Sequence, residues 1–173
     1  MISRWLRASA LLTVTALAGC VTLGGPGEQA LDDPCPVPSG PPTAPHRIAI
    51  DHDDHRAEHV GHTADGRQFF LTRPFQPDGT EYVALYLFTA GGTFDEALID
   101  PYDKKVFGSR LAGLGPVTYG RISVEPFAVD RFGTTFGLIS TPPEAAGDLW
   151  WVTAEPGDYM AFTAPWDCGD YDT

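Results

Sequence analysis

The sequence predicts a mainly β fold, an antiparallel sandwich or open barrel with little helix, preceded by a signal peptide and a disordered tether. After about residue 46, short apolar segments alternate with turn residues such as Asp-Gly and Pro-Gly. These segments are rich in the aromatic and β-branched residues that favour strands. Residues 1–45 instead contain an apolar run and then a Gly- and Pro-rich stretch. We therefore expect a signal peptide at 1–19, a tether at 20–45 and a single β-rich domain at 46–173.

The first twenty residues have the three zones of a secretory signal. Arg4 and Arg7 precede an apolar run over 8–18, and small residues lead into Leu17-Ala18-Gly19-Cys20. A run of this length is too short to cross a bilayer core of about 30 Å as a helix. Basic residues ahead of it and small residues behind it are typical of a cleavable signal peptide.

The ending Leu17-Ala18-Gly19-Cys20 resembles the lipobox of bacterial lipoproteins, which is Leu, two small residues and Cys. The resemblance implies cleavage before Cys20, a diacylglycerol on its thiol and an acyl chain such as palmitate on its amine. Several acyl chains hold a protein on a membrane durably. The expected location is the cell envelope, on a membrane facing the periplasm or exterior. The residue after the cysteine is Val21 and not Asp, and by the same resemblance this favours the outer membrane if the host is Gram-negative.

An ordinary cleavable signal and an uncleaved anchor are the alternatives to lipidation. If the lipobox functions, a full chain expressed in a bacterium will carry acyl groups on Cys20, and Cys20→Ser will lose them. Intact-mass analysis of the membrane fraction measures this. An unmodified Cys20 in the wild-type protein would contradict the assignment.

Residues 20–45 are too rich in Gly and Pro to bury much surface, so we expect a flexible spacer. Cys35 lies in it, and Cys168 lies near the end of the chain. In an oxidising envelope these two thiols are candidates for one disulfide. That bond would close a loop of about 130 residues, worth about 4–5 kcal/mol in the chain-entropy model. The alternative is two unpaired thiols.

Strand candidates follow in order. Segments 58–63 and 67–73 flank Asp65-Gly66, and a two-residue loop there pairs His62 with Phe69 and Val60 with Leu71. Segment 82–90 is apolar on both faces, which predicts a central strand that turns at Gly91-Gly92 into 94–99. A short helix is expected over 103–111. The remaining strand candidates are 117–124, 132–140, 148–153 and 158–163.

The aromatic residues of these segments are expected to fill the core. The alternative is a platform on which a ligand stacks. The set comprises Phe69, Phe70, Tyr82, Tyr86, Phe88, Trp150 and Trp151.

The net charge argues against two kinds of partner. The chain carries −12, and loss of Arg4 and Arg7 with the signal leaves 9 basic and 23 acidic side chains, net −14. Such a surface repels nucleic acid and anionic lipid. We therefore expect membrane contact through the lipid anchor only, and a protein or small ligand of unknown identity as partner.

All five histidines lie between positions 46 and 62, interleaved with carboxylates. Imidazole and carboxylate bind Zn²⁺ and Cu²⁺, so this tract is a candidate metal site. The alternative is a solvated acidic loop, and no HExxH or other zinc signature is present. The candidate ligands are Asp51, His52, Asp54, His55 and His59.

Signatures of catalysis are missing from the sequence. There is no G-x-S-x-G elbow, and Cys168 lies among Asp167, Gly169 and Asp170, which disfavour a reactive thiolate. The stretches 64–75, 82–92, 131–139 and 156–173 resemble an uncharacterised family of small bacterial proteins, a resemblance that implies no activity. We expect a non-enzymatic envelope binding module. The alternatives are a carboxylate-dependent hydrolase and a structural protein that pairs with a protein partner.

Overall fold

The computed structural model describes residues 43–145, 147–157 and 159–173, all of which lie in one compact unit, Cys35–Thr173. The signal peptide, Cys20, Cys35 and the tether up to residue 42 lie outside the described residues. The described elements are β1 (Ile48–Ile50), β2 (Val60–Thr63), β3 (Gln68–Thr72), β4 (Tyr82–Phe88), β5 (Phe94–Pro101), α1 (Lys104–Gly113), β6 (Val117–Tyr119), β7 (Ile122–Val124), β8 (Phe127–Arg131), β9 (Thr134–Thr141), β10 (Trp151–Glu155) and β11 (Ala161–Phe162).

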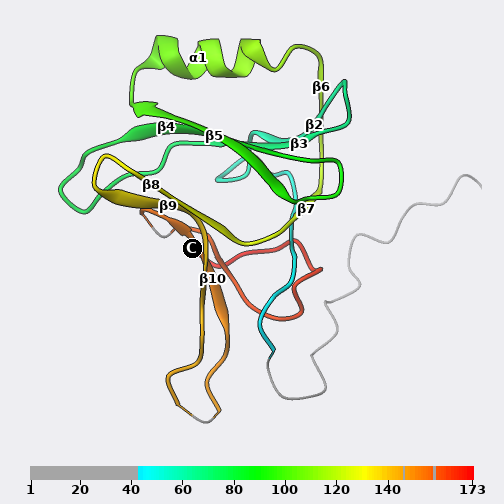
Figure 1. The fold of residues 1–173 in the computed structure, drawn as a ribbon, viewed down its shortest axis with the longest axis vertical. Coiled ribbons are helices and arrows are strands. Elements are labelled where there is room, and N and C mark those ends of the chain that lie inside the picture. The colour runs from blue at the N-terminus through cyan, green and yellow to red at the C-terminus, as the bar shows by residue number, and fades with distance from the viewer. Residues whose placement is uncertain (1–42, 146, 158) are drawn as a thin grey trace, which may run out of the picture. The chain divides into compact units, whose positions relative to one another are not determined.

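These strands form antiparallel, open sheets, which confirms the predicted mainly β fold (Figure 1). In the described residues, one sheet has the order β5-β4-β3-β2-β6 and another has β11-β10-β9-β8. β1 and β7 form a separate pair. The two larger sheets approach each other where β5 meets β8, and the rings of Phe94 and Phe127 stack there at 4.5 Å.

The central strand is β4, which is buried along its whole length, as predicted. Its alternate residues enter two different cores. Tyr82, Ala84, Tyr86 and Phe88 belong to a core shared with β1, β7 and the four-stranded sheet. The intervening residues Val83, Leu85 and Leu87 pack on the side of α1. Figure 1 shows α1 over one face of the five-stranded sheet and the β8-β9-β10 ribbon on the other side.

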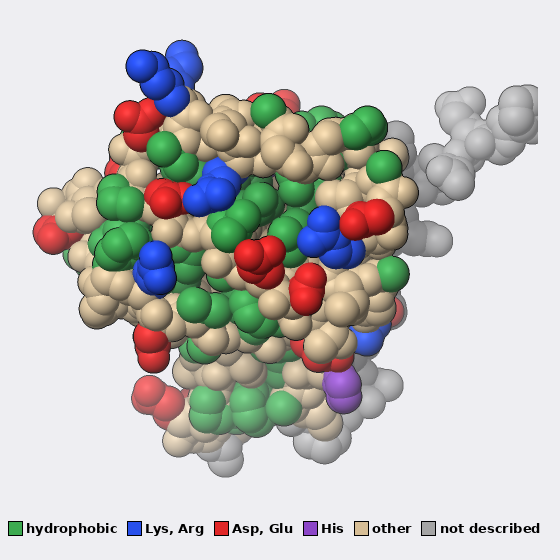
Figure 2. All heavy atoms as spheres, turned by 45° about the horizontal axis from the view of Figure 1, so that its top comes forward, with side chains coloured by type: hydrophobic (Ala, Val, Ile, Leu, Met, Phe, Trp, Pro, Cys, Tyr) green, Lys and Arg blue, Asp and Glu red, His purple; other side chains and the backbone are tan. Residues whose placement is uncertain are grey.

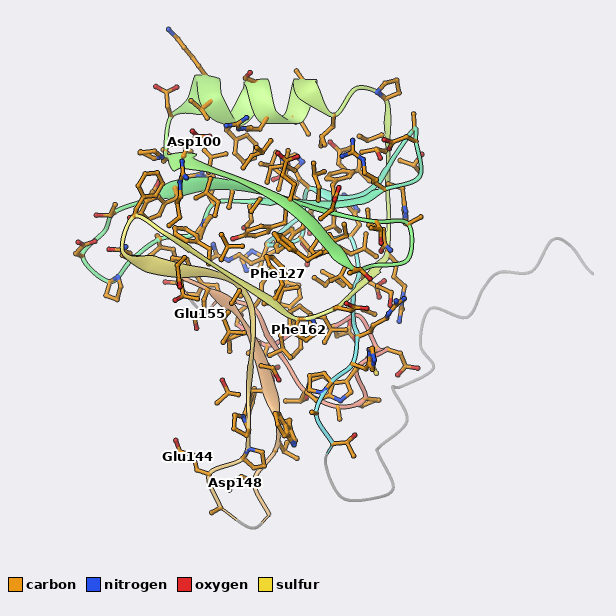
Figure 3. The ribbon with its side chains drawn as sticks, in the orientation of Figure 1. Asp100, Phe127, Glu144, Asp148, Glu155 and Phe162 are labelled. Atoms are coloured by element: carbon orange, nitrogen blue, oxygen red, sulfur yellow. The ribbon has the colours of Figure 1, made fainter. Side chains whose placement is uncertain are left out.

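Helix α1 confirms the predicted helix over 103–111. Asp103 is its N-cap, and its carboxylate accepts hydrogen bonds from Lys105 N (2.6 Å) and Val106 N (3.4 Å). Arg110 ties the helix to β5 through two hydrogen bonds to Asp100 Oδ2, and Asp100 is labelled in Figure 3. Gly108 does not interrupt the helix, because it lies on the exposed side. No helix within the described ranges is long and apolar enough to span a membrane.

The predicted register of the β2–β3 hairpin is wrong by one residue. The observed pairs are Val60 with Phe70 and His62 with Gln68. The loop has three residues, because Gly66 adopts φ +86° and the Asp65 carboxylate accepts from Thr63 Oγ1 and Arg67 N. A shift of one residue exchanges the faces of a strand, so Phe70, and not Leu71, shares a core with Val60.

Two strand boundaries were also predicted wrongly. Segment 117–124 is two strands, since the chain leaves one sheet at Gly120 and enters another: β6 pairs with β2, and β7 pairs with β1. Phe132 begins no strand but lies in the β8–β9 turn at φ +53°. β8 itself was not predicted, because its mixed, mostly exposed residues lack a clear alternation.

Most of the aromatic residues predicted to be core are buried, but the two tryptophans are not. Phe69, Phe70, Tyr82, Tyr86 and Phe88 are at most 5 % exposed. Trp150 is half-buried and Trp151 is 39 % exposed. Trp151 is the first residue of β10, which forms one arm of the projecting β9–β10 hairpin (Figure 1).

Candidate ligand-binding site

A pocket lies between the end of β3, the middle of β4 and the segment that joins β10 to β11. We call it the inner pocket. Its cavity volume is about 40 Å³. The empty space of the pocket is about 400 Å³ when the part that opens to solvent is included. The residues that matter most for its chemistry are Arg56, Phe75, Tyr86, Glu155, Tyr159 and Met160.

Two glycines, Gly137 and Gly157, line the inner pocket together with Tyr86. Gly137 adopts φ +136°, and a Cβ there would lie 2.2 Å from the carbonyl oxygen of Phe127. Gly157 adopts φ +105°, and a Cβ there would lie 2.8 Å from the ring of Phe75. Both backbone positions therefore require glycine, and glycine brings no side chain to fill the space.

Tyr86 supplies the one buried tyrosine hydroxyl without a partner among the described residues. The residue is 2 % exposed and lines the inner pocket. Burial raises the pKa of Tyr86 far above its ordinary value, so the phenol remains protonated and able to donate. Tyr82, on the same face of β4, differs in that its oxygen accepts a hydrogen bond from Gln76 Nε2 at 3.0 Å. An unpaired buried hydroxyl costs about 1–3 kcal/mol, so its retention needs an explanation.

Aromatic rings and a guanidinium form the mouth of the pocket. The rings of Phe75 and Tyr159 stack at 4.8 Å. The guanidinium carbon of Arg56 lies 4.1 Å from the centre of the Tyr159 ring. These groups present a flat apolar surface next to a fixed positive charge.

A larger, shallower depression continues outward from this mouth, and we call it the outer hollow. Its empty volume is about 950 Å³ up to open solvent, and it shares Arg56, Arg73 and Tyr159 with the inner pocket. The residues that it adds include His55, Glu58, His59, Glu81 and Phe107. Figure 2 shows acidic and basic side chains interspersed on the face that it draws, with hydrophobic atoms between them.

The loop that carries Arg56 is held by the C-terminal tail. The Asp53 carboxylate accepts hydrogen bonds from His55 N (2.8 Å), Ala57 N (2.9 Å) and the hydroxyl of Tyr171. The Tyr171 oxygen in turn accepts from Arg56 N at 3.0 Å. Burial, followed by the hydrogen bond to Asp53, raises the pKa of Tyr171 to about 12. Burial alone would raise the pKa of Asp53, but its hydrogen bonds from Tyr171, His55 and Ala57 outweigh burial and lower it.

The predicted metal ligands do not converge. Asp51 Oδ2 pairs with Arg121 Nη1 at 3.3 Å, and Asp54 is exposed. The ring of His52 packs on Tyr119 at 5.3 Å, while His59 packs between Phe107 and Tyr119. His55 is exposed and lines the outer hollow. Within the described residues, no three His, Cys, Asp or Glu side chains are placed to bind one metal ion. The arrangement therefore gives the Zn²⁺ or Cu²⁺ prediction no support.

The disulfide prediction is open, because Cys35 lies outside the described residues. Cys168 is half-buried, and its carbonyl oxygen accepts a hydrogen bond from Arg121 Nη1 at 3.2 Å. The neighbouring Gly169 approaches Asp51 so closely that a Cβ would lie 2.2 Å from the carboxylate. The tail is thus packed tightly against the segment that follows β1.

Sequence reasoning missed the residues of the inner pocket. Tyr86 was predicted to be core, and Arg56, Glu155 and Tyr159 were not singled out. One signal was available, because Tyr82 and Tyr86 place the two side-chain hydroxyls on a strand whose other residues are apolar. Nothing local in the sequence connects that strand to Arg56 or to Glu155.

Comparison with known protein families, characterised proteins and solved structures finds no match to this chain. The resemblances of residues 1–20 to lipoprotein precursors and of the domain to an uncharacterised family therefore stay predictions.

The Asp53 contacts predict a specific dependence of stability on pH. Folding lowers the pKa of Asp53 below its value in the unfolded chain, which is about 3.9. The charged Asp53 carboxylate therefore stabilises the fold above about pH 3.9, and this stabilisation is lost as the pH falls through the pKa of the folded state. We expect Asp53→Asn to lower the free energy of unfolding by about 1 kcal/mol at pH 7, and the difference from wild type to shrink below about pH 4. Urea titrations of the full chain at several pH values measure this, with the exposed neighbour Asp54→Asn as control. A difference that is constant from pH 7 to pH 3 would contradict the assignment.

Proposed function

We propose that the domain is a non-enzymatic binding module that holds a small organic ligand in the inner pocket and outer hollow. The hydroxyl of Tyr86 is its hydrogen-bonding anchor. In this proposal the lipid on Cys20 keeps the module on an envelope membrane, as the sequence of residues 1–20 favours.

The unpaired Tyr86 hydroxyl is the observation that carries the proposal. The apolar residues Phe70, Phe75 and Met160 line the inner pocket together with the polar side chains of Arg56, Thr72, Arg73 and Glu155. Concave, mainly apolar sites with a few placed polar groups are typical of small-molecule binding. A ligand atom that hydrogen-bonds to Tyr86 would remove the cost of leaving that hydroxyl unpaired.

The dimensions limit what can enter. The cavity volume of about 40 Å³ admits a group of a few heavy atoms, because a single water needs about 10–15 Å³ of such volume. An aromatic ring does not fit into this space. The proposed ligand therefore inserts a short hydrogen-bonding group beside Tyr86 and lays the rest over the outer hollow.

The hydrolase alternative has weaker support. A general acid at neutral pH needs a carboxyl group with a raised pKa. Among the described residues, the carboxyl groups with shifted pKa values are Asp53, Asp65 and Asp78, and all three are shifted downward. These shifts stabilise charged carboxylates in turns and leave no proton to donate.

A fragment screen by ligand-observed NMR on the full chain tests the proposal. We expect hits that perturb residues of the inner pocket and whose affinity falls about 10-fold in Tyr86→Phe, because one neutral hydrogen bond is lost. Tyr119→Phe is the matched control, since Tyr119 is 42 % exposed and does not line the inner pocket.

Two outcomes would contradict the proposal. One is the absence of any fragment that binds at the inner pocket. The other is binding there that Tyr86→Phe leaves unchanged.

A further inference from the structure

The charged groups of the site narrow the class of ligand, once the proposed function is accepted. Most described arginines are paired with a carboxylate: Arg47, Arg67, Arg73, Arg110 and Arg121. Arg56 is different, because its guanidinium has no ion pair or hydrogen bond with the described part of the chain. Among the described arginines, Arg56 and Arg131 are the two without an ion pair to a described carboxylate.

Arg56 is also held in place before any ligand arrives. Its side chain lies on the ring of Tyr159, and its backbone N–H donates to Tyr171. A guanidinium that is already positioned loses less side-chain entropy when it binds an anion. Its donors suit a carboxylate or another planar anion.

A second charge of opposite sign lines the same pocket. Glu155, at the end of β10, accepts one hydrogen bond on Oε1 from Thr153 Oγ1 at 3.1 Å. No cation lies within ion-pair distance of it among the described residues. Figure 3 shows Glu155 at the end of β10 nearer the five-stranded sheet, far from Glu144 and Asp148 at the tip of the β9–β10 hairpin.

The charged side chains of Arg73, Glu81 and Glu58 each lie within 3.9 Å of a group that can pair with them. Arg73 Nη2 lies 3.0 Å from Glu81 Oε2, so these two residues form an ion pair. The side chain of Glu58 is 65 % exposed and lies 3.9 Å from His59 Nε2. Among the described residues that line the inner pocket, Arg56 and Glu155 are thus the charged groups without an ion pair to another described residue.

We infer that the ligand is a small zwitterion, with its anionic group on Arg56, its cationic group on Glu155 and a short hydrogen-bonding portion beside Tyr86. A ligand with an anionic group alone would bring a negative charge next to Glu155 without compensation. A ligand with a cationic group alone would bring a positive charge next to Arg56 without compensation. Like charges placed together oppose binding, so both are selected against.

The test uses a series in which the distance between the two charges increases: glycine, β-alanine, 4-aminobutyrate and 6-aminohexanoate. Butyrate and butylamine carry one charge each. Isothermal titration of the full chain measures each affinity. We expect at least one amino acid to bind saturably and about 10-fold or more tighter than both singly charged compounds.

Two variants test whether Arg56 binds the anionic group of the ligand and Glu155 its cationic group. Arg56→Gln and Glu155→Gln should each weaken the best amino acid about 10- to 100-fold, because each removes a charge-assisted hydrogen bond. The matched controls are Arg131→Gln and Glu144→Gln. Arg131 also has no ion pair in the described residues and lies over Phe132, whereas Glu144 lies at the hairpin tip. Thermal denaturation of each variant confirms that it is folded.

The outcomes distinguish this inference from the proposed function. Equal affinity for butyrate or butylamine, or no effect of Glu155→Gln, would overturn the zwitterion. If uncharged fragments still bind in a Tyr86-dependent manner, the proposed function stands without it. If neither the amino acids nor any fragment binds in a Tyr86-dependent manner, both fail.

Discussion

The burial of β4 on both faces is the constraint on which the other layers depend. A strand with seven buried residues needs a cover on each side, and its alternation sends Leu85 toward α1 and Tyr86 toward the four-stranded sheet. Helix α1 and the β8–β11 sheet meet this requirement. On the Tyr86 side the cover includes the small residues Gly137, Ala154 and Gly157, which line the inner pocket.

The contacts that build the mouth of this pocket come from distant parts of the chain. Arg56 is positioned by Tyr159 and by Tyr171, and Tyr171 also binds Asp53 across 118 residues. The C-terminal tail thus determines where a charged residue of the 51–57 loop lies. If the predicted Cys35–Cys168 disulfide forms, it will act on the same tail and stabilise this arrangement further. Within the described part of the chain, most other arginines pair with a nearby carboxylate, whereas the Arg56 guanidinium does not.

The fold was predictable from local patterns, whereas the site was not. An unbroken apolar segment identified β4, and the short helix expected over 103–111 corresponds to α1. The hairpin register was missed because Asp65 and Gly66 allow both two- and three-residue loops, and the side-chain bonds of Asp65 select the longer one. The histidine tract is a local signal, but packing separates His52 and His59 from Asp51 and Asp54. The inner pocket depends on long-range contacts of Arg56, Tyr86 and Glu155, which no spacing in the sequence records.

The Tyr86 hydroxyl has no hydrogen-bond partner among the described residues, and we propose that it is retained for a ligand. The most direct measurement is the free energy of unfolding, by urea titration without added ligand, of the wild-type chain and of Tyr86→Phe. The account predicts that the phenylalanine variant is as stable as wild type or more stable, by up to about 1–2 kcal/mol, because it removes an unpaired buried polar group. A loss of about 1 kcal/mol or more would contradict it, since the hydroxyl would then already be hydrogen-bonded in the free domain.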